Sequence, residues 1–108
     1  MSEAAQHPMG RLDDTVHQRV RLAVLAVLAE ADRAEFTYLR DALELTDGNL
    51  SRHLGVLEQA GYVRIRKTIE ARKPRTWVHA TRRGRAALAA EVAALRELLG
   101  GLGAAADR

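Results

Sequence analysis

The hydrophobic positions in the first third of the chain recur at helical spacing. Residues 1–11 are polar and aperiodic, and we expect them to form a mobile tail. Asp13, Asp14 and Thr15 then offer N-caps and first-turn acids to a helix that is predicted to run to about Ala31. This helix is apolar nearly all round, so it needs cover on both sides, and a second subunit is one source of that cover.

Two shorter helices joined by a tight turn are predicted next. A short strand at Glu35-Phe36 leads into the first, which Thr37 caps. Thr46 is placed as the N-cap of the second, and Gly61 suits the left-handed conformation that commonly ends a helix. The pair forms a candidate helix-turn-helix motif.

From Tyr62 onward apolar residues alternate with polar ones, which is typical of β-strands. A first strand is followed by a basic turn at 71–74 and a second strand over 75–80. Thr81 caps a last helix that is expected to reach about Leu99, where Gly100 and Gly101 end it and leave residues 100–108 as a flexible tail.

The order helix, short strand, helix, helix, hairpin, helix defines the predicted fold class. It is α+β and mostly helical, a winged helix-turn-helix with a two-stranded β-hairpin wing and a long C-terminal helix. The chain is short enough for one domain, which we expect at residues 12–99.

Positive charge is concentrated in the hairpin and its surroundings. The chain has 17 Lys and Arg against 14 Asp and Glu, and residues 61–85 hold nine of the basic residues with Glu70 as their only acid. One basic segment on an otherwise acidic chain predicts a surface that faces a polyanion, with a solvated hairpin as the alternative.

The element order and this charge together predict contacts with double-stranded DNA. The helix after Thr46 can enter a major groove, where Arg pairs with guanine and Asn with adenine, while wing arginines meet phosphates. Gly48 either lets a phosphate approach the backbone or serves packing alone. The candidate DNA-binding residues are Thr46, Gly48, Asn49, Ser51, Arg52, His53, Arg64, Arg66, Arg72, Lys73 and Arg75.

The helix-turn-helix sequence also resembles a known family. The run Leu-Thr-Asp-Gly-Asn-Leu-Ser-Arg-His-Leu at 45–54, with Leu57-Glu58 and Ala-Gly-Tyr-Val at 60–63, resembles winged-helix transcriptional regulators related to the MarR and ArsR families. Segments 17–28, 74–76 and 81–88 match the same pattern, so the resemblance spans roughly residues 12–99. It implies a prokaryotic, homodimeric DNA-binding regulator, with base contacts at Asn49, Ser51, Arg52 and His53 and wing contacts from Arg72 and Lys73.

Apolar stripes on the first and last helices also predict a homodimer. The last helix has little of its own domain to cover it, although packing inside one subunit is the alternative. The candidate interface residues are Val20, Val24, Leu28, Leu88, Val92, Leu95 and Leu99.

The sequence does not indicate catalysis or a cofactor. The chain has no cysteine, and His7, His17, His53 and His79 lack metal-ligand spacing, so no metal is expected. No nucleophile with a base and no phosphate loop can be assembled. The longest apolar run, Leu22 to Ala29, is far shorter than the roughly 20 residues of a membrane helix, and we expect a cytoplasmic protein without a membrane partner.

We therefore expect a sequence-specific DNA-binding transcriptional regulator that acts as a homodimer, and we favour repression because a compact dimer acts most simply by occupying a promoter. The alternative is a winged-helix protein-interaction module whose basic wing faces an acidic partner. A small-molecule effector stays open, because larger MarR relatives build a ligand cavity from additional helices and this chain has little beyond one C-terminal helix.

Overall fold

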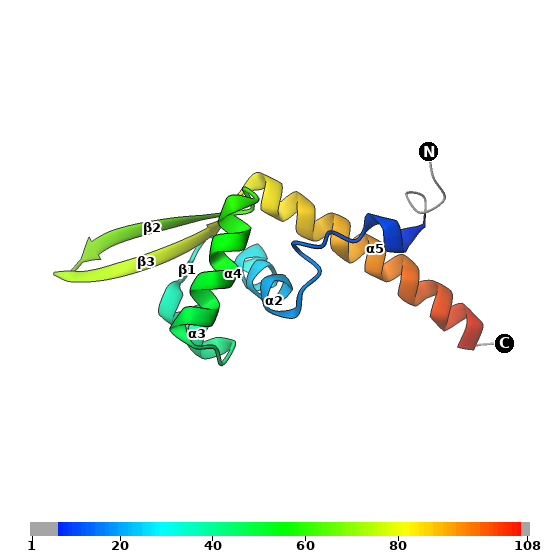
Figure 1. Ribbon diagram of the computed structural model, residues 1–108, viewed down its shortest axis with the longest axis horizontal. Coiled ribbons are helices and arrows are strands. Elements are labelled where there is room, and N and C mark those ends of the chain that lie inside the picture. Colours follow the sequence, from blue (N-terminus) through cyan, green and yellow to red (C-terminus); the bar gives the residue numbers. More distant parts are fainter. Residues whose placement is uncertain (1–6, 107–108) are drawn as a thin grey trace.

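The computed structural model describes residues 7–106, with only the helical backbone described for 103–106. The β2–β3 hairpin extends from one side of a helical body and α5 from the other, which gives the molecule extents of 60 × 31 × 23 Å (Figure 1). The winged helix-turn-helix that the sequence predicts is confirmed. In chain order the elements are η1 (Pro8–Arg11), α2 (Arg19–Glu30), β1 (Ala34–Glu35), α3 (Phe36–Ala42), α4 (Asp47–Gln59), β2 (Val63–Glu70), β3 (Lys73–Ala80) and α5 (Arg82–Ala106).

The three strands form one antiparallel sheet in the order β1-β3-β2. β1 lies one residue earlier than the sequence predicts, because Phe36 already begins α3. The cap predicted at Thr37 is also wrong: Thr37 lies inside α3, and Glu35 occupies the N-cap position without a side-chain hydrogen bond.

The turn of the hairpin is tighter than the predicted turn at 71–74. Lys73 already pairs with Glu70, so Ala71 and Arg72 alone connect the strands. Both have positive φ, 52° and 66°, which is the conformation of a type I′ two-residue turn whose twist matches that of the strands. An L-residue with a Cβ is strained there, so the strand pairing holds the turn against its local preference.

A single hydrophobic core joins the helices to the sheet. Val24 and Leu28 are fully buried in this core, so their assignment to a dimer interface is wrong. The reason is that α2 packs against α4, β3 and α5 of its own subunit, which cover the faces that the sequence left without a partner. The buried cluster consists of Val16, Val24, Leu25, Leu28, Ala34, Leu39, Leu50, Leu54, Leu57, Val63 and Val78.

α2 begins at Arg19 rather than near Asp13. The side chain of Gln18 caps the helix by accepting a hydrogen bond of 2.9 Å from the backbone N–H of Arg21. The carboxylate of Asp13 instead accepts the N–H of Thr15 at 2.8 Å, which closes a turn before the helix. The predicted helix cap at Asp13 is therefore wrong, because this residue closes a turn and Gln18 caps the helix.

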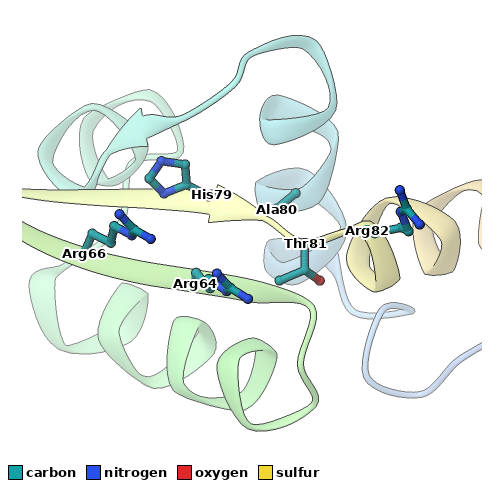
Figure 2. Close-up of a pocket in the computed structure, with 6 residues that line it drawn as sticks. All are labelled: Arg64, Arg66, His79, Ala80, Thr81 and Arg82. Carbon is teal, nitrogen blue, oxygen red and sulfur yellow. The ribbon is translucent and has the colours of Figure 1, made fainter.

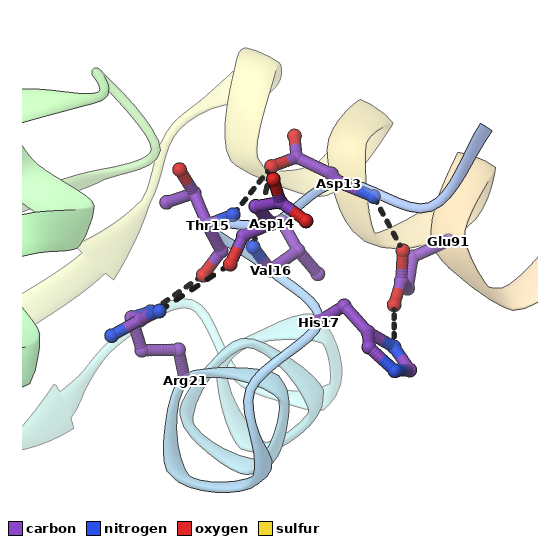
Figure 3. Close-up of polar contacts among 7 residues, drawn as sticks. All are labelled: Asp13, Asp14, Thr15, Val16, His17, Arg21 and Glu91. Atoms are coloured by element: carbon purple, nitrogen blue, oxygen red, sulfur yellow. Dashed lines mark hydrogen bonds and ion pairs between the residues drawn. The ribbon is translucent and has the colours of Figure 1, made fainter. Parts of the chain in front are cut away.

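A buried carboxylate ties this N-terminal turn to α5 (Figure 3). Glu91 of α5 is fully buried, and its two oxygens lie 3.0 Å from the backbone N of Asp13 and 2.6 Å from Nδ1 of His17. Tyr62 donates to the Asp13 carboxylate at 2.7 Å. Burial opposes ionisation of Asp13, but the hydrogen bonds from Tyr62 and the Thr15 and Val16 N–H groups outweigh it and lower the pKa of Asp13.

The two ends of the described chain differ from the predicted tails. Pro8–Arg11 forms a 3-10 helix that packs against α5, where Arg11 pairs with Glu97, so this part of the predicted mobile tail is wrong. Residues 1–6 lie outside the described residues. α5 continues through Gly100 and Gly101 to Ala106, because glycine in a helix costs only about 1 kcal/mol and does not by itself end it.

The joint between the hairpin and α5 is closely packed. Thr81 accepts the N–H of Gly84 at 3.0 Å, which confirms it as the cap of α5, and it donates to the carbonyl of Gly61 at 2.6 Å. Gly61 has φ of 81°, the predicted left-handed conformation. A Cβ at Gly84 would lie 2.0 Å from the carbonyl oxygen of Tyr62, so only glycine fits at this position.

Candidate nucleic-acid interface

α4 is a well-capped helix with one outward face. Thr46 is its N-cap, as predicted, and accepts the backbone N–H of Asn49 at 3.1 Å. Leu50, Leu54 and Leu57 fix the inner face in the core. The residues that remain exposed along the helix include Gly48, Asn49, Ser51, Arg52 and Val56. Asn49, Arg52 and Val56, spaced three and four residues apart, therefore present an amide, a guanidinium and an apolar group along one face, while the hydroxyl of Ser51 lies on the side of α4 toward β2. These are groups that read base edges in a major groove.

His53 does not belong to this outward face, contrary to the sequence prediction. It is only 8% exposed, and its Nδ1 lies 3.2 Å from a guanidinium nitrogen of Arg21 on α2. Because Arg21 can only donate, the imidazole accepts at Nδ1. Burial and the charges of Arg21 and Arg52 lower the pKa of His53, which keeps the ring neutral. The sequence prediction placed Arg52 and His53 on the same exposed face. In the structure Arg52 is exposed, whereas the side chain of His53 points toward α2.

Arg21 connects α4 to the N-terminal turn. Its guanidinium donates to the carbonyl of Thr15 at 2.6 Å and to that of Asp14 at 3.4 Å (Figure 3). The same turn is held by Glu91 of α5 through the backbone of Asp13. Hydrogen bonds therefore run from α4 through α2 to α5, and they fix the tilt of the outward face of α4 relative to the rest of the subunit.

Gly48 has no packing role inside the subunit. A Cβ built at this residue meets no atom within 4 Å. Of the two explanations that the sequence left open, packing within the subunit is therefore excluded. Close approach of an external group to the start of α4, where backbone N–H groups and the helix dipole favour an anion, remains.

The tip of the wing is basic and open to solvent. Arg72 and Lys73 are exposed at the turn, and Ile69 beside them is 79% exposed. A convex cationic tip of this kind fits the phosphates that border a groove.

The sheet face opposite the core differs from what the sequence predicts, because its arginines have different surroundings. Arg75, counted among the DNA-binding candidates, pairs with Glu35 at 2.6 Å. Nearby, Trp77 donates to Glu70 at 2.6 Å and carries the guanidinium of Arg33 over its ring at 3.7 Å. In this half of the face the positive charge is compensated inside the subunit.

The other half of that face forms a basic pocket at the base of the hairpin (Figure 2). Arg64 and Arg66 project from β2, His79 from β3, and Arg82 begins α5. With Ala80 and Thr81 they surround a cavity of about 450 Å³. Sequence reasoning assigned Arg64 and Arg66 to the DNA surface and missed this pocket. Their alternation along the strand was the signal available in the sequence, whereas their register opposite His79 and Trp77 is set by the fold.

Arg64 and Arg66 are separated from α4 by the sheet itself. Strand residues alternate between faces, and Val63 and Ile65, which flank Arg64, pack toward the core that α4 covers. Arg64 and Arg66 therefore point to the opposite face. The structure brings most of the proposed DNA-binding residues into two sets, the α4 face with the wing tip and the basic pocket, and leaves His53 and Arg75 bound inside the subunit.

Within the part of the chain that the structure describes, no three His, Asp or Glu side chains gather as metal ligands. Among the same residues, no helix combines the length and the apolar character that crossing a membrane requires.

Comparison with known proteins agrees with this fold. The family described as "Winged helix DNA-binding domain" matches residues 20–99. An uncharacterised protein of Methanocaldococcus jannaschii is 41% identical over 68 residues, which are 63% of this chain and 74% of that protein. A structure titled as a transcriptional regulator homologue from Pyrococcus horikoshii OT3 is 32% identical with a TM-score of 0.82, covering 94% of this chain and 98% of the other.

A more distant structure shares the fold alone. HlyU from Vibrio cholerae is 24% identical with a TM-score of 0.60, over 91% of this chain and 97% of that chain.

Proposed function

The chain belongs to the winged-helix DNA-binding domain family, a family of transcriptional regulators rather than enzymes, and on that premise we propose that it is a sequence-specific repressor that binds double-stranded DNA as a homodimer. The observation that carries the proposal is the outward face of α4, on which Asn49, Ser51 and Arg52 lie exposed together. Within the described residues, none of these side chains is engaged in a hydrogen bond or ion pair of the subunit.

In the proposed complex the start of α4 enters the major groove. Arg52 pairs with the two acceptors of a guanine, and Asn49 pairs with an adenine. The open space at Gly48 lets a phosphate approach the backbone N–H groups at the start of α4. The wing tip, with Arg72 and Lys73, meets phosphates and supplies affinity without a sequence code. His53 and Arg75 are left out of this interface because both are bound inside the subunit.

The proposed dimer is formed by α5 rather than by α2. Leu99 and Leu102 near the end of α5 are 63% and 66% exposed, and Val92 and Leu95 are half-buried along the same helix. Leu88 packs on the core instead, so the interface begins beyond it. Two-fold pairing of α5 covers this apolar strip and presents two α4 helices to half-sites about 10 base pairs apart or a multiple of that distance. Occupation of a promoter by such a dimer gives repression.

The test of base reading is a titration of wild-type protein and Arg52→Ala against a selected binding sequence and a random duplex. We expect Arg52→Ala to lose about 1–3 kcal/mol of affinity for the selected sequence and little for the random one. Arg85→Ala, which removes the same charge from an exposed position at the start of α5, before the proposed interface, is the matched control and should change neither. Equal losses on both duplexes would make Arg52 a phosphate contact. Absence of any duplex binding would favour the protein-interaction alternative.

The test of the dimer is sedimentation of the wild type and of Leu99→Asp. A charge in the apolar strip should dissociate the dimer and lower DNA affinity sharply, because two weak half-site contacts no longer act as one ligand. A wild-type monomer at tens of micromolar that binds one asymmetric site tightly would contradict the dimer.

A further inference from the structure

The basic pocket at the base of the hairpin has the size and lining of a ligand site. Its volume of about 450 Å³ lies within the range of about 300–1,000 Å³ that is usual for small-molecule pockets. Three of its six lining residues are arginines, a fourth is His79, and no carboxylate lines it (Figure 2). A concave wall of cations is the arrangement that binds a small anion.

The charge of this pocket is not compensated inside the subunit. Among the residues that the structure describes, Arg64, Arg66 and Arg82 form no ion pair, whereas Arg75 on the same sheet face pairs with Glu35. Glu70 near the tip accepts from Trp77 and Thr68 and does not line the pocket. Glu35 and Glu70 are therefore engaged away from the pocket, and Asp32, whose charge acts on His79, forms no ion pair with the three arginines among the described residues. The three arginines are left to an external anion.

A polar atom of the pocket wall also lacks a partner. Nδ1 of His79 is buried and, within the described residues, forms no hydrogen bond. Such an atom is costly to leave unsatisfied, and nearly all buried polar groups in folded proteins are paired. Because this atom is closed to solvent, an anion in the pocket acts on the His79 ring through its charge and not through a hydrogen bond to Nδ1.

The position of the pocket argues against a phosphate of the bound duplex. The sheet lies between Arg64 and Arg66 on one side and α4 on the other. From Arg64 to the turn at Ala71 the strand is about 20 Å long, so the wing tip can follow a groove without bringing the base of the hairpin to it.

We propose that this pocket binds a small organic phosphate as a ligand separate from DNA. Arg64 and Arg66 approach from β2 and Arg82 from the start of α5, so their forks come from two elements rather than from one plane. A tetrahedral phosphate accepts hydrogen bonds from several directions, whereas a single carboxylate is satisfied by one fork. The organic part occupies the remainder of the cavity beside Ala80 and Thr81.

The experiment is calorimetric titration of the DNA-free protein with pyrophosphate and with ribose 5-phosphate, at constant ionic strength and with ribose as the uncharged control. We expect the phosphate compounds to bind saturably with a stoichiometry of one molecule per chain, and ribose not to bind. Binding should also shift the His79 imidazole resonance in the NMR spectrum. The variant Arg64→Ser/Arg66→Ser should weaken binding at least about tenfold, since it removes two charge-assisted hydrogen-bonding groups.

The matched control is Arg72→Ser/Lys73→Ser, which removes the same charge from the tip of the same hairpin and should change the dissociation constant less than about twofold. If Arg64→Ser/Arg66→Ser folds poorly, Arg82→Ser, which lies outside the sheet, provides the same test of phosphate binding. No binding to the wild type at millimolar concentration, or equal losses in both double variants, would overturn the proposal.

A DNA titration separates the two sources of phosphate. If the pocket serves a free ligand, Arg64→Ser/Arg66→Ser leaves the salt dependence of DNA binding unchanged. A reduction as large as that of the tip variant, without binding of either phosphate compound, would assign the pocket to the DNA backbone and overturn the proposal. The inference does not rest on sequence-specific repression, because phosphate binding is measured without DNA.

Discussion

The two ends of the wing carry similar charge but differ in shape. At the tip, Arg72 and Lys73 stand on a strained two-residue turn and are open to solvent. At the base, Arg64, Arg66 and Arg82 line one cavity together with His79. The sequence shows both ends as one basic segment.

The difference shows that the arrangement of charge, and not its amount, selects the partner. A convex tip meets a long polyanion at a few exposed points, where contacts are weakened by salt. A concave base can surround a compact anion and exclude part of its water, which makes each contact stronger. The following changes separate the two ends.

The largest effect is expected from Gly84→Ala, at the joint that supports the base. Its Cβ would lie 2.0 Å from the Tyr62 carbonyl, so either α5 or the hairpin must move. We expect a loss of about 3 kcal/mol or more in the free energy of unfolding and a Tm lower by about 12 °C or more. Thermal and urea denaturation measure it.

Gly55→Ala is the control for that change, because a Cβ at Gly55 in α4 meets nothing within 4 Å. It should raise the free energy of unfolding by up to about 1 kcal/mol through helix propensity. Similar stability of the two variants would show that the joint relaxes freely and does not hold the base in place.

The tip variant Arg72→Ser/Lys73→Ser should have the next largest effect, on DNA. Removal of two phosphate contacts lowers the slope of log K against log salt by about 1.8, which is roughly 60-fold in affinity at about 0.1 M salt. The loss should be the same for selected and random duplexes. An unchanged slope would show that the tip does not touch DNA.

A moderate pH dependence of stability is expected from the buried His53 and the half-buried His79. The pKa of His79 is lowered by burial and by nearby positive charge, and that of His53 by burial, Arg21 and Arg52. The charged groups that act on His79 are Arg66, Arg33, Arg64 and the opposing Asp32. Because the unfolded chain takes up these protons first, the contribution of each ring is complete above about pH 6.5 and is lost as pH falls through its folded-state pKa.

Urea denaturation between pH 7.5 and 5.5 tests this, with a slope of at most about 1.4 kcal/mol per pH unit for each histidine. His53→Gln and His79→Gln should each remove part of the slope. Pyrophosphate should reduce the contribution of His79 alone, since an anion at the base favours the protonated ring. If pyrophosphate changed the pH dependence of stability equally in His79→Gln and in the wild type, the anion would not lie beside His79.

The smallest effect is expected at the turn. Ala71 has φ of 52°, where Asn is favoured over Ala, so Ala71→Asn should raise the free energy of unfolding by about 0.5–1 kcal/mol. No charge changes, so the salt slope of DNA binding should stay as in the wild type. A changed slope would mean that the shape of the tip, and not only its charge, sets the number of phosphate contacts.

The parts of the fold that follow from local chemistry were predictable. Thr46 and Thr81 cap helices because a hydroxyl satisfies the N–H three residues later, and Gly61 ends α4 because only a left-handed residue fits there. The strand alternation from Val63 likewise predicted the hairpin.

The errors occur where a distant partner decides. Asp13 was read as a helix cap because the sequence does not show Tyr62 and Glu91, which hold it in a turn. Val24 and Leu28 were assigned to a dimer because the cover supplied by β3 and α4 is nonlocal. The basic pocket depends on strand register and on the start of α5, so no single segment of the sequence contains it.

Because α5 is long, a small rotation at the joint near Gly84 moves the far end of the helix by a large distance. A helix of 25 residues is about 38 Å long, so a rotation of about 5° at its first turn sweeps its far end through about 3 Å. In a two-fold symmetric dimer joined at that far end, both protomers undergo the symmetry-related rotation. The distance between the two α4 helices therefore changes. DNA fixes the spacing of its grooves, so in the proposed dimer a small rotation at this joint would change how well the two α4 helices match the pitch of the duplex.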